Sequence, residues 1–569
     1  MIRNLLKKLP YVLWILPGFL LWASFPPMGE RFDSFFALAP ILWYARRHDA
    51  RKSFRTWFAN GFFFWFATLS WMPAIIKNGG PWYLVVLGWG VLSAYCALYF
   101  GLFGWFSSRV WGWVRGRSYG WRLFAIVVAE PVLWSGLELV RSRFLGGFAW
   151  NQLGVPAVNA GLGSPASLGG VYLVSALVIL VNGTFASIAE RMLEPFEGRL
   201  AALFGRKGPS VDLSGEKAEA AFAAPATPPL SFPKWVRSVE TLLPFLLILG
   251  VYRLAKPAAP QEEGTVPVRF GLMQRDFPPP FKPAEDWRPA YGAMIGELVQ
   301  QRPDVLVLPE SALCEMAPDV ISPHANAFVG SWLGLCAPSA VVAGGSRRDA
   351  VGRMYNSAAA YTLWNGTNVV SSQVYDKVHL VPFGEFIPGD KLVPALQQLA
   401  PVGSCTPGEL KLLGVNVRGV PVRVAPAICY EDTDSAQIRR QAEMGAQVLV
   451  FMTNDSWFSE SVETEQHAWQ AVARAIETGL PVVRVGNSGV SGTVSPAGKA
   501  RWLSDEAGKP LVDRRGTACV SVDLEENPRR TAYVRLGDWP LGLAFLLLIT
   551  AMGVIKYKHD YEKRRKVSL

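Results

Sequence analysis

The chain has 569 residues, of which half are hydrophobic and only 18% are charged, and its mean hydropathy is +0.20. This length is too great for one ordinary hydrophobic core, and soluble enzymes rarely reach a positive mean hydropathy. The composition therefore argues against a single soluble domain and favours a membrane protein. The net charge of +11 would suit binding to nucleic acid, but the positions of the basic residues argue against it, as described below.

Residues 1 to about 255 contain seven apolar segments that we interpret as membrane spans, and an eighth lies near the C-terminus. The eight segments are residues 9–25, 34–44, 57–76, 82–106, 123–140, 168–188, 242–254 and 540–555. The first resembles a signal peptide but has no convincing cleavage site, so we expect an uncleaved helix. The second is short for a span and could be re-entrant.

Basic residues lie mainly on one side of these predicted spans. If the N-terminus is cytoplasmic, the cytoplasmic segments include the basic stretches 46–55, 109–122 and 563–566. The opposite short loops hold few basic residues, namely Arg31, Lys77 and Arg143. The positive-inside rule then predicts that both chain ends are cytoplasmic and that the region between the last two spans lies across the membrane. Basic residues beside anionic lipid also account for the net charge without nucleic acid.

Strand-like and helical patterns alternate between the seventh and eighth spans, which is typical of an α/β domain. We expect strands at 266–273, 305–308, 340–344, 358–363, 422–428, 446–452, 481–485 and 492–494, and helices at 287–301, 324–336 and 465–478. The predicted organisation is a membrane domain (1–255), an extracytoplasmic α/β domain (256–538), and a last span with a basic tail (539–569).

Three motifs of this α/β domain each bring a reactive side chain to a strand end. Glu310 ends DVLVLPE, Lys377 lies in YDKVHLVPFGEFIP, and Cys429 follows the apolar run of PVRVAPAICYE. Each residue has an ordinary alternative, because free cysteines are often buried, lysines are usually solvated, and a strand-end carboxylate can cap a helix. Together they suit acyl transfer, in which a carboxylate takes the thiol proton, an ammonium stabilises the oxyanion and the sulfur carries the acyl group.

These motifs, in this order, resemble the nitrilase superfamily, and the longer form of the lysine motif resembles its membrane-bound branch, the apolipoprotein N-acyltransferases. NDSWF at 454–458 and FAWNQLG at 148–154 fit the same branch. The resemblance implies a four-layer α-β-β-α sandwich beside an α-helical membrane bundle of about eight transmembrane helices. It also implies that Glu310 is the general base, Lys377 the oxyanion-stabilising group and Cys429 the nucleophile.

Further side chains are expected to support this site. Glu385 and Glu431 would orient Lys377 or relay a proton, and the backbone N–H of Tyr430 is a candidate second oxyanion donor. The residues expected to shape the pocket are Asn356, Asn454, Trp457 and Phe458.

Two segments are candidates for the lipid entrance and for a lid. The Gly-rich loop 146–168 is either a plain connection or, as the resemblance favours, the lining of a lipid entrance, with Trp150 in it. Residues 276–287, DFPPPFKPAEDW, fall where the resembling enzymes carry a mobile aromatic arm, and Phe281 or Trp287 would be its aromatic residue. The run of prolines departs from the family pattern.

No metal or other cofactor is expected. The six cysteines show no CxxC pairing and no histidine-rich ligand spacing, which argues against a zinc site. A disulfide between Cys314 and Cys405 is possible and is left open by the sequence. His379 and His467 suggest a Cys–His pair, but the family uses no catalytic histidine, so we expect structural hydrogen bonds instead.

The resemblance implies transfer of a fatty acyl chain from a phospholipid, with phosphatidylethanolamine as the expected donor, through a thioacyl-cysteine. The acceptor would be the α-amino group of the N-terminal diacylglyceryl-cysteine of apolipoproteins. We expect a monomer in the bacterial inner membrane, in contact with membrane lipids and with its α/β domain on the periplasmic side. The alternatives are a membrane-tethered amidase or nitrile hydrolase that uses water as acceptor and, from another class, a transporter with a binding ectodomain.

Overall fold

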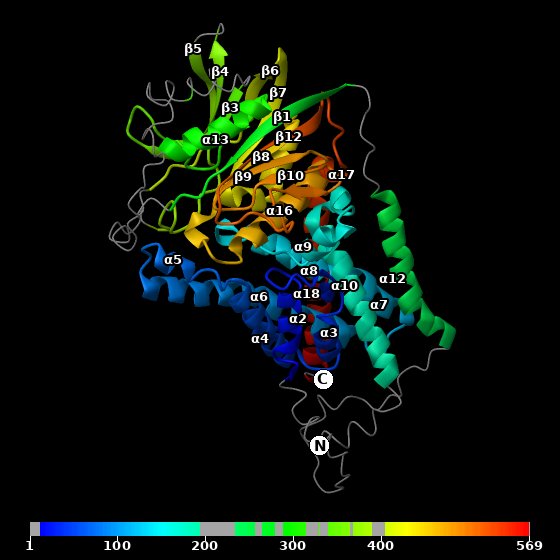
Figure 1. Ribbon diagram of the computed structural model, residues 1–569. Helices are drawn as coiled ribbons and strands as arrows, with labels where there is room; N and C mark the ends of the chain where they lie inside the picture. The colour runs from blue at the N-terminus through cyan, green and yellow to red at the C-terminus, as the bar shows by residue number, and fades with distance from the viewer. Residues whose placement is uncertain are drawn as a thin grey trace.

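The computed structural model of the chain describes residues 12–193, 234–255, 264–278, 288–313, 329, 340–364, 368–389 and 404–567. A bundle of helices forms one part of the molecule and an α/β domain forms the other (Figure 1). The described chain enters the α/β domain after helix α12 and leaves it into helix α18, so the bundle holds this domain at both ends.

Helices occupy all eight segments that the sequence predicts to be spans. They are α2 (Leu16–Ala23), α3 (Ala39–Ala45), α4 (Ala50–Thr68), α6 (Trp82–Val114), α7 with α8 (Tyr119–Phe124 and Glu130–Arg141), α10 (Ala166–Leu193), α12 (Lys234–Leu254) and α18 (Trp539–Val567). Short elements between them are α5 (Ala74–Lys77), α9 (Val155–Ala157) and the turns η1 (Arg31–Phe35), η2 (Ala125–Ala129), η3 (Phe144–Gly146) and η4 (Val158–Leu162).

Four helical stretches in the described ranges are long and apolar enough to cross a membrane. They are Trp82–Val114, Tyr119–Arg141, Ala166–Leu193 and Trp539–Glu562. The predicted second span is the shortest, because a 3₁₀ turn (η1) precedes it and α3 begins only at Ala39. That element is therefore too short to span a membrane alone.

A buried ion pair lies inside the bundle. Arg46 and Glu130 form an ion pair at 2.7 Å with side chains at most 1% exposed, and Ser107 and Trp111 also donate to Glu130. The sequence predicts an interruption at Glu130 and Pro131. The helix instead continues through them after the π-helical turn η2, because Pro131 lies in the first turn of α8, where a missing N–H costs little.

The described strands of the α/β domain form two six-stranded sheets. The first has the order β12-β1-β2-β3-β4-β5 and the second β11-β10-β9-β8-β7-β6. The strands are β1 (Thr265–Gln274), β2 (Val305–Val307), β3 (Ala340–Arg348), β4 (Met354–Trp364), β5 (Asn368–Asp376), β6 (Leu413–Val417), β7 (Val420–Ile428), β8 (Val448–Asn454), β9 (Val482–Asn487), β10 (Gly492–Val494), β11 (Ala500–Trp502) and β12 (Gly516–Glu525). Four of them, β5, β6, β11 and β12, have no counterpart among the strands expected from the sequence.

The two sheets face each other across one hydrophobic core, to which β1, β2, β7 and β8 all contribute buried aliphatic side chains. Helix α13 (Arg288–Gln301) packs on the outer face of the first sheet, and α15 (Ser435–Glu443) and α16 (Glu463–Thr478) pack on the outer face of the second. The domain is thus the four-layer α-β-β-α sandwich that the sequence comparison implies. The short helix α17 (Ala532–Leu536) leads from the sandwich into α18.

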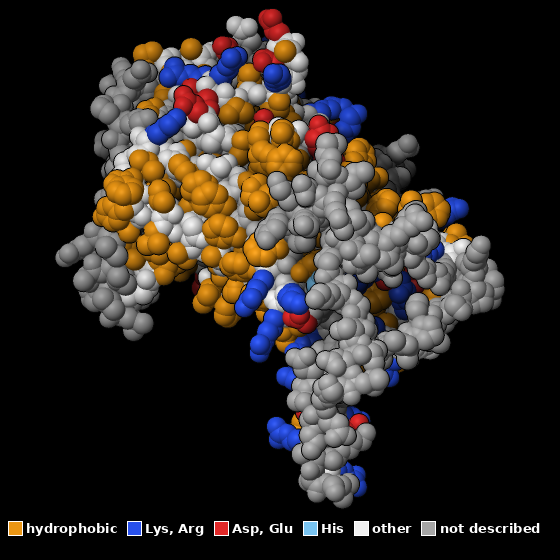
Figure 2. Space-filling view, turned by 90° about the horizontal axis from the view of Figure 1, so that it is seen from below, with side chains coloured by type: hydrophobic (Ala, Val, Ile, Leu, Met, Phe, Trp, Pro, Cys, Tyr) orange, Lys and Arg blue, Asp and Glu red, His pale blue; other side chains and the backbone are white. Residues whose placement is uncertain are grey.

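Helix α16 forms the contact layer between the two parts of the molecule. It lies between the second sheet and the bundle (Figure 1), and most of its side chains are buried, including the ionisable ones of Glu463, His467, Arg474 and Glu477. The face seen in Figure 2, from the bundle side, carries broad hydrophobic areas, with Lys and Arg side chains gathered near its centre. A hydrophobic exterior with basic clusters is what a lipid-embedded bundle requires.

Candidate active site

The strand ends of the two sheets bring the three predicted reactive side chains to one edge of the sandwich. Glu310 follows β2 through Leu308 and Pro309, Lys377 directly follows β5, and Cys429 directly follows β7. The backbone of Glu310 lies against Gly344 of β3, where an added Cβ would come within 2.6 Å of the Glu310 Cα. A side chain at position 344 would therefore displace the carboxylate.

Glu310, Lys377, Glu385 and Asn356 form one polar cluster. The Lys377 Nζ lies 3.0 Å from Glu385 Oε1 and 3.8 Å from Glu310 Oε1. The Asn356 amide nitrogen donates to both Glu310 Oε1 and Glu385 Oε1, each at 2.7 Å. One ammonium and one amide thus hold two carboxylates together in a site where the Lys377 side chain is only 1% exposed.

The environment of these groups sets their protonation. Burial raises the pKa of the Glu310 carboxyl, and the charge of Lys377 offsets part of this rise. Burial by itself would lower the pKa of Lys377, but the Glu385 and Glu310 carboxylates raise it, so the ammonium stays charged. Burial, followed by the charge of Glu310, raises the pKa of the Cys429 thiol well above its usual value. The resting sulfur is therefore a thiol, and a base must take its proton before it can attack.

Cys429 lies in a strained turn at the strand end. Its φ is 53°, in the left-handed region that side chains rarely adopt, and it begins a short 3₁₀ turn, η7 (Cys429–Thr433). Strain of this kind persists only where the surrounding structure enforces it, and it is frequent at reactive residues. The turn exposes part of the sulfur-bearing side chain at the edge of the sheet.

Glu431 holds that turn in place. Its Oε2 accepts the backbone N–H of Ile428 at 2.8 Å, and its Oε1 accepts those of Val378 at 2.7 Å and His379 at 3.1 Å, as well as the Tyr375 hydroxyl at 2.8 Å. Glu431 therefore ties the cysteine turn to the segment that carries Lys377. The His379 ring lies 3.7 Å from Asp434, a contact that gives it a structural partner.

A loop of the membrane bundle lies directly beneath Tyr430. The Trp150 and Phe148 rings lie nearly parallel to the Tyr430 ring, with centroids 6.4 Å and 6.2 Å away, and the Ala149 N–H donates to the Tyr430 hydroxyl at 3.0 Å. The Trp150 indole N–H donates to Gln466 of α16 at 2.9 Å. This loop, in which the sequence places a lipid entrance, therefore contacts the neighbour of the cysteine.

The NDSWF motif also contacts the bundle. The Asn454 amide oxygen accepts from Asn487 at 2.8 Å, and Asn487 in turn bonds both backbone groups of Phe277, at the base of the predicted lid. Phe458 packs edge-on against Trp71, with centroids 4.9 Å apart, and the Trp457 carbonyl accepts from Asn78 at 2.8 Å. The other predicted lid residues, Phe281 and Trp287, lie outside the described residues, as does Cys314.

A buried charge network behind the cysteine turn was not anticipated from the sequence. His467 lies between Asp432 at 3.0 Å and Asp455 at 3.1 Å, and Arg484 contacts both aspartates. Although burial by itself would lower the pKa of His467, the facing Asp432 and Asp455 raise it to about 10, so the imidazole is charged. Asp432 directly follows ICYE and Asp455 is the aspartate of NDSWF, which is the one sequence signal that could have pointed to them.

Glu463 adds a further carboxyl to this network, 3.4 Å from His467. Asp455, Glu463 and His467 each present one donor atom, all within 4.8 Å of one another, so by spacing alone they could share a cation. The nearby guanidinium of Arg484, 3.3 Å from Asp455, already supplies positive charge there. Burial and the charge of Asp455 raise the pKa of the Glu463 carboxyl well above its usual value, so this carboxyl is neutral and the two aspartates balance the charges of His467 and Arg484.

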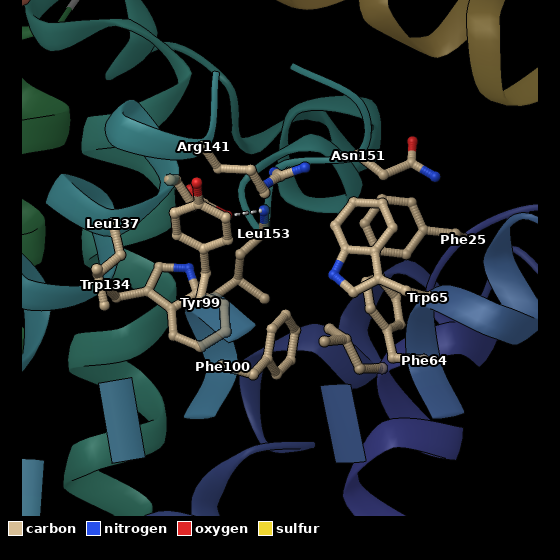
Figure 3. Close-up of a pocket in the computed structure, with 12 residues that line it drawn as sticks. Phe25, Phe64, Trp65, Tyr99, Phe100, Trp134, Leu137, Arg141, Asn151 and Leu153 are labelled. Atoms are coloured by element: carbon tan, nitrogen blue, oxygen red, sulfur yellow. Dashed lines mark hydrogen bonds between the residues drawn. The ribbon is translucent and has the colours of Figure 1, made fainter. Parts of the chain in front are cut away.

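A narrow cavity lies inside the bundle below the Trp150 loop. Its volume is about 20 Å³, enough for one water molecule, and Figure 3 shows aromatic rings around it with Arg141 and Asn151 at one end. Arg141 donates to the carbonyls of Phe148 and Trp150, and the Glu138 carboxylate accepts the Leu153 N–H at 2.8 Å. The lining residues are Leu21, Phe25, Phe64, Trp65, Tyr99, Phe100, Trp134, Leu137, Glu138, Arg141, Asn151 and Leu153.

Two family models match the chain. The apolipoprotein N-acyltransferase N-terminal domain matches residues 17–184, and carbon-nitrogen hydrolase matches residues 291–515. Among curated relatives, the apolipoprotein N-acyltransferase of Geobacter metallireducens is 29% identical over 93% of this chain and 92% of its own length. That of Vibrio vulnificus is 26% identical over 86% of each chain. Among solved structures, an amidase from Nesterenkonia sp. is 18% identical, covers 49% of this chain and 96% of its own, and has a TM-score of 0.34.

Proposed function

Because this chain belongs to the apolipoprotein N-acyltransferases, the membrane-bound branch of the carbon-nitrogen hydrolases, we propose that it acylates lipoproteins at the N-terminus. It is a multi-pass membrane enzyme whose substrates are a lipid and a lipoprotein. The observation that carries the proposal is the polar cluster of Glu310, Lys377, Glu385 and Asn356 at the strand ends that also deliver Cys429.

In the first half-reaction, Glu310 takes the proton of the Cys429 thiol, and the thiolate attacks the ester carbonyl of a phospholipid. Lys377 and the backbone N–H of Tyr430 stabilise the oxyanion of the tetrahedral intermediate. The intermediate collapses, the C–O bond breaks, and Glu310 returns the proton to the departing lysophospholipid alkoxide. A fatty thioester on Cys429 remains.

In the second half-reaction, the neutral α-amino group of the diacylglyceryl-cysteine attacks the thioester. Glu310 accepts the proton that the amine loses as the C–N bond forms. The C–S bond then breaks, and the proton passes to the Cys429 sulfur, which restores the resting thiol. The raised pKa of Glu310 suits a group that takes and returns a proton in each half-reaction.

The bundle beneath the site supports a lipid substrate rather than a small soluble amide. The Trp150 loop contacts Tyr430 and, through Asn151 and Leu153, lines a cavity that is walled by aromatic side chains. A volume of about 20 Å³ holds no fatty chain, so the helices around the cavity must separate when a chain enters. Keeping water from the thioester is what distinguishes a transferase from a hydrolase here.

The proposal also covers the acyl donor, the oligomeric state and the location of the enzyme. The donor is phosphatidylethanolamine, the enzyme is a monomer, and it resides in the bacterial inner membrane with its catalytic domain on the periplasmic side. The supports are the asymmetric distribution of basic residues and the need for both lipid-anchored substrates to reach one site at the bilayer surface.

Intact-mass spectrometry of the purified protein after incubation with phosphatidylethanolamine tests the proposal. The wild type is expected to gain one fatty acyl group that hydroxylamine removes, and Cys429→Ala to gain none. Cys519→Ala, at a half-buried position on β12, is the matched control and should be acylated like the wild type. An unmodified wild type that releases free fatty acid would instead support a hydrolase, and acylation of Cys429→Ala would refute the assigned nucleophile.

A further inference from the structure

A second cavity lies on the opposite edge of the second sheet from Cys429. Its volume is about 240 Å³. Its described lining residues are Arg423, Ala442, Gly445, Ala446, Thr478, Leu480, Asn527, Pro528, Arg529, Arg530 and Val534. Arg423 stands near the start of β7 and Cys429 just past its end, so the strand separates the two sites by about 20 Å at 3.3 Å per residue. The cavity therefore has no part in the polar cluster around Glu310.

The walls of this cavity are cationic. Arg423, Arg529 and Arg530 line it, and no carboxylate side chain does so among the described lining residues. Its nearest acidic neighbour along α15, Glu443, is already paired with Arg439 at 3.0 Å. A concave site with three guanidinium groups attracts an anion.

Two of the three arginines also form hydrogen bonds within the protein. Arg423 donates from Nε to the Gly445 carbonyl at 2.6 Å, and Arg530 donates to the Glu443 carbonyl at 2.7 Å, so both cap the C-terminal end of α15. Arg529 differs, because its exposed side chain makes no hydrogen bond or ion pair within the part of the chain that the structure describes. The N–H donors of its guanidinium group therefore remain available to a ligand.

The cavity lies close to the membrane surface. Arg530 precedes Trp539, the first residue of the apolar helix α18, by nine positions, and α17 occupies five of the residues between them. Tyr533 of α17 packs against Gly170, at the kink where the continuous part of α10 begins. Trp539 is exposed, as expected of an aromatic residue at a lipid–water boundary.

We propose that this cavity binds the phosphate group of an anionic phospholipid from the leaflet that faces the catalytic domain. A guanidinium fork matches two phosphate oxygens, and the cavity has room for a phosphate and its ester linkages. The site is separate from the one that takes the acyl donor. Lipid held there would fix the height and tilt of the catalytic domain over the bilayer.

The test compares Arg529→Gln with Arg535→Gln in the full-length, detergent-solubilised protein. Arg535 is an exposed arginine on α17, nearer the membrane, and it does not line the cavity, so its loss removes the same charge without touching the site. Native mass spectrometry would count the phosphatidylglycerol and phosphatidylethanolamine molecules retained from an equimolar mixture. We expect the wild type and Arg535→Gln to retain one phosphatidylglycerol, and Arg529→Gln to bind it about tenfold more weakly.

Equal retention in the wild type and Arg529→Gln would overturn the proposal, and so would equal losses in the two variants, which would indicate only diffuse attraction to the basic surface. Inorganic phosphate as competitor separates the two possible sources of the anion. If only a large excess of phosphate displaces the phosphatidylglycerol, the site is a lipid site. If phosphate binds and phosphatidylglycerol cannot displace it, the proposal is overturned. Acylation of Cys429 should be unchanged in Arg529→Gln, and Arg529→Lys provides a second variant if that one does not fold.

Discussion

The Trp150 indole of the membrane bundle lies nearly parallel to the Tyr430 phenol ring, at an interplanar angle of 10° and a centroid separation of 6.4 Å. Tyr430 directly follows Cys429, the proposed nucleophile, so a residue of the membrane part contacts the turn that carries this cysteine. The bundle therefore contacts the catalytic edge of the sandwich directly.

Trp150→Ala is expected to slow acylation of Cys429 by about fivefold, because it removes an aromatic contact worth about 1 kcal/mol and leaves Tyr430 free to shift. Trp150→Phe keeps the ring contact but loses the hydrogen bond to Gln466, so its acylation rate should lie between those of the wild type and Trp150→Ala. The initial rate of thioester formation by mass spectrometry is the measurement. Wild-type rates in both variants would show that the contact has no catalytic consequence.

Asn356→Leu should reduce the acylation rate by at least about a hundredfold, comparable to removal of one polar group from an oxyanion site. The amide is shared by Glu310 and Glu385, and without it their carboxylates face each other with only Lys377 between them. Asn416→Leu, in an exposed hairpin where the amide oxygen accepts from Gly419, is the matched control and should retain full activity. An active Asn356→Leu enzyme would remove this residue from the site.

Replacing Arg484 with Met should destabilise the protein by about 3–5 kcal/mol, because Asp432 and Asp455 would keep their buried charges without their guanidinium partner. Arg501→Met, at an exposed position on the edge strand β11 of the same sheet, should change stability by no more than about 0.5 kcal/mol. Thermal unfolding of the detergent-solubilised protein distinguishes them. Equal unfolding midpoints for the wild type and Arg484→Met would mean that one of the aspartates takes up a proton when the guanidinium is lost.

Glu477 should make stability depend on pH. Burial raises its pKa to about 7 in the folded protein. The unfolded chain releases this proton near pH 4.3 whereas the folded protein retains it, so wild-type stability falls as pH rises from about 4.3 to about 7, at up to about 1.4 kcal/mol per pH unit. Glu477→Gln cannot ionise and should lack this part of the slope. Parallel stability–pH curves for the two proteins would contradict the assignment.

The sequence predicted the parts of the molecule that depend on local pattern. The short apolar runs before Glu310 and Cys429 are the strands β2 and β7, which end at Val307 and Ile428, and the apolar segments of the first 255 residues are helices. Strand β6 is a five-residue edge strand that pairs only with the adjacent β7, whereas the place of β12 in its sheet depends on a partner far away in the chain. Strand β12, for example, pairs along its whole length with β1, some 250 residues earlier.

The site was predicted less completely than the fold. The motif residues could be named because each lies within a distinctive stretch of sequence. The network of Asp432, Asp455, His467 and Arg484 could not, since its four members come from four separate elements and meet only in the folded protein. The role of Glu431 as a clamp between two strand ends likewise follows from its hydrogen bonds and not from its neighbours in sequence.

Helix α16 has a consequence for how the molecule is assembled. Its outward face bonds to the bundle through Gln466, which accepts from Trp150, and through Glu477, which accepts the Val171 N–H of α10 at 2.7 Å. A catalytic domain cut free of its helices would turn these polar groups and their apolar surroundings toward water. The domain is therefore not an independent module on a tether. The bundle instead covers the outer face of its last helical layer, so this layer is complete only where the two parts are in contact.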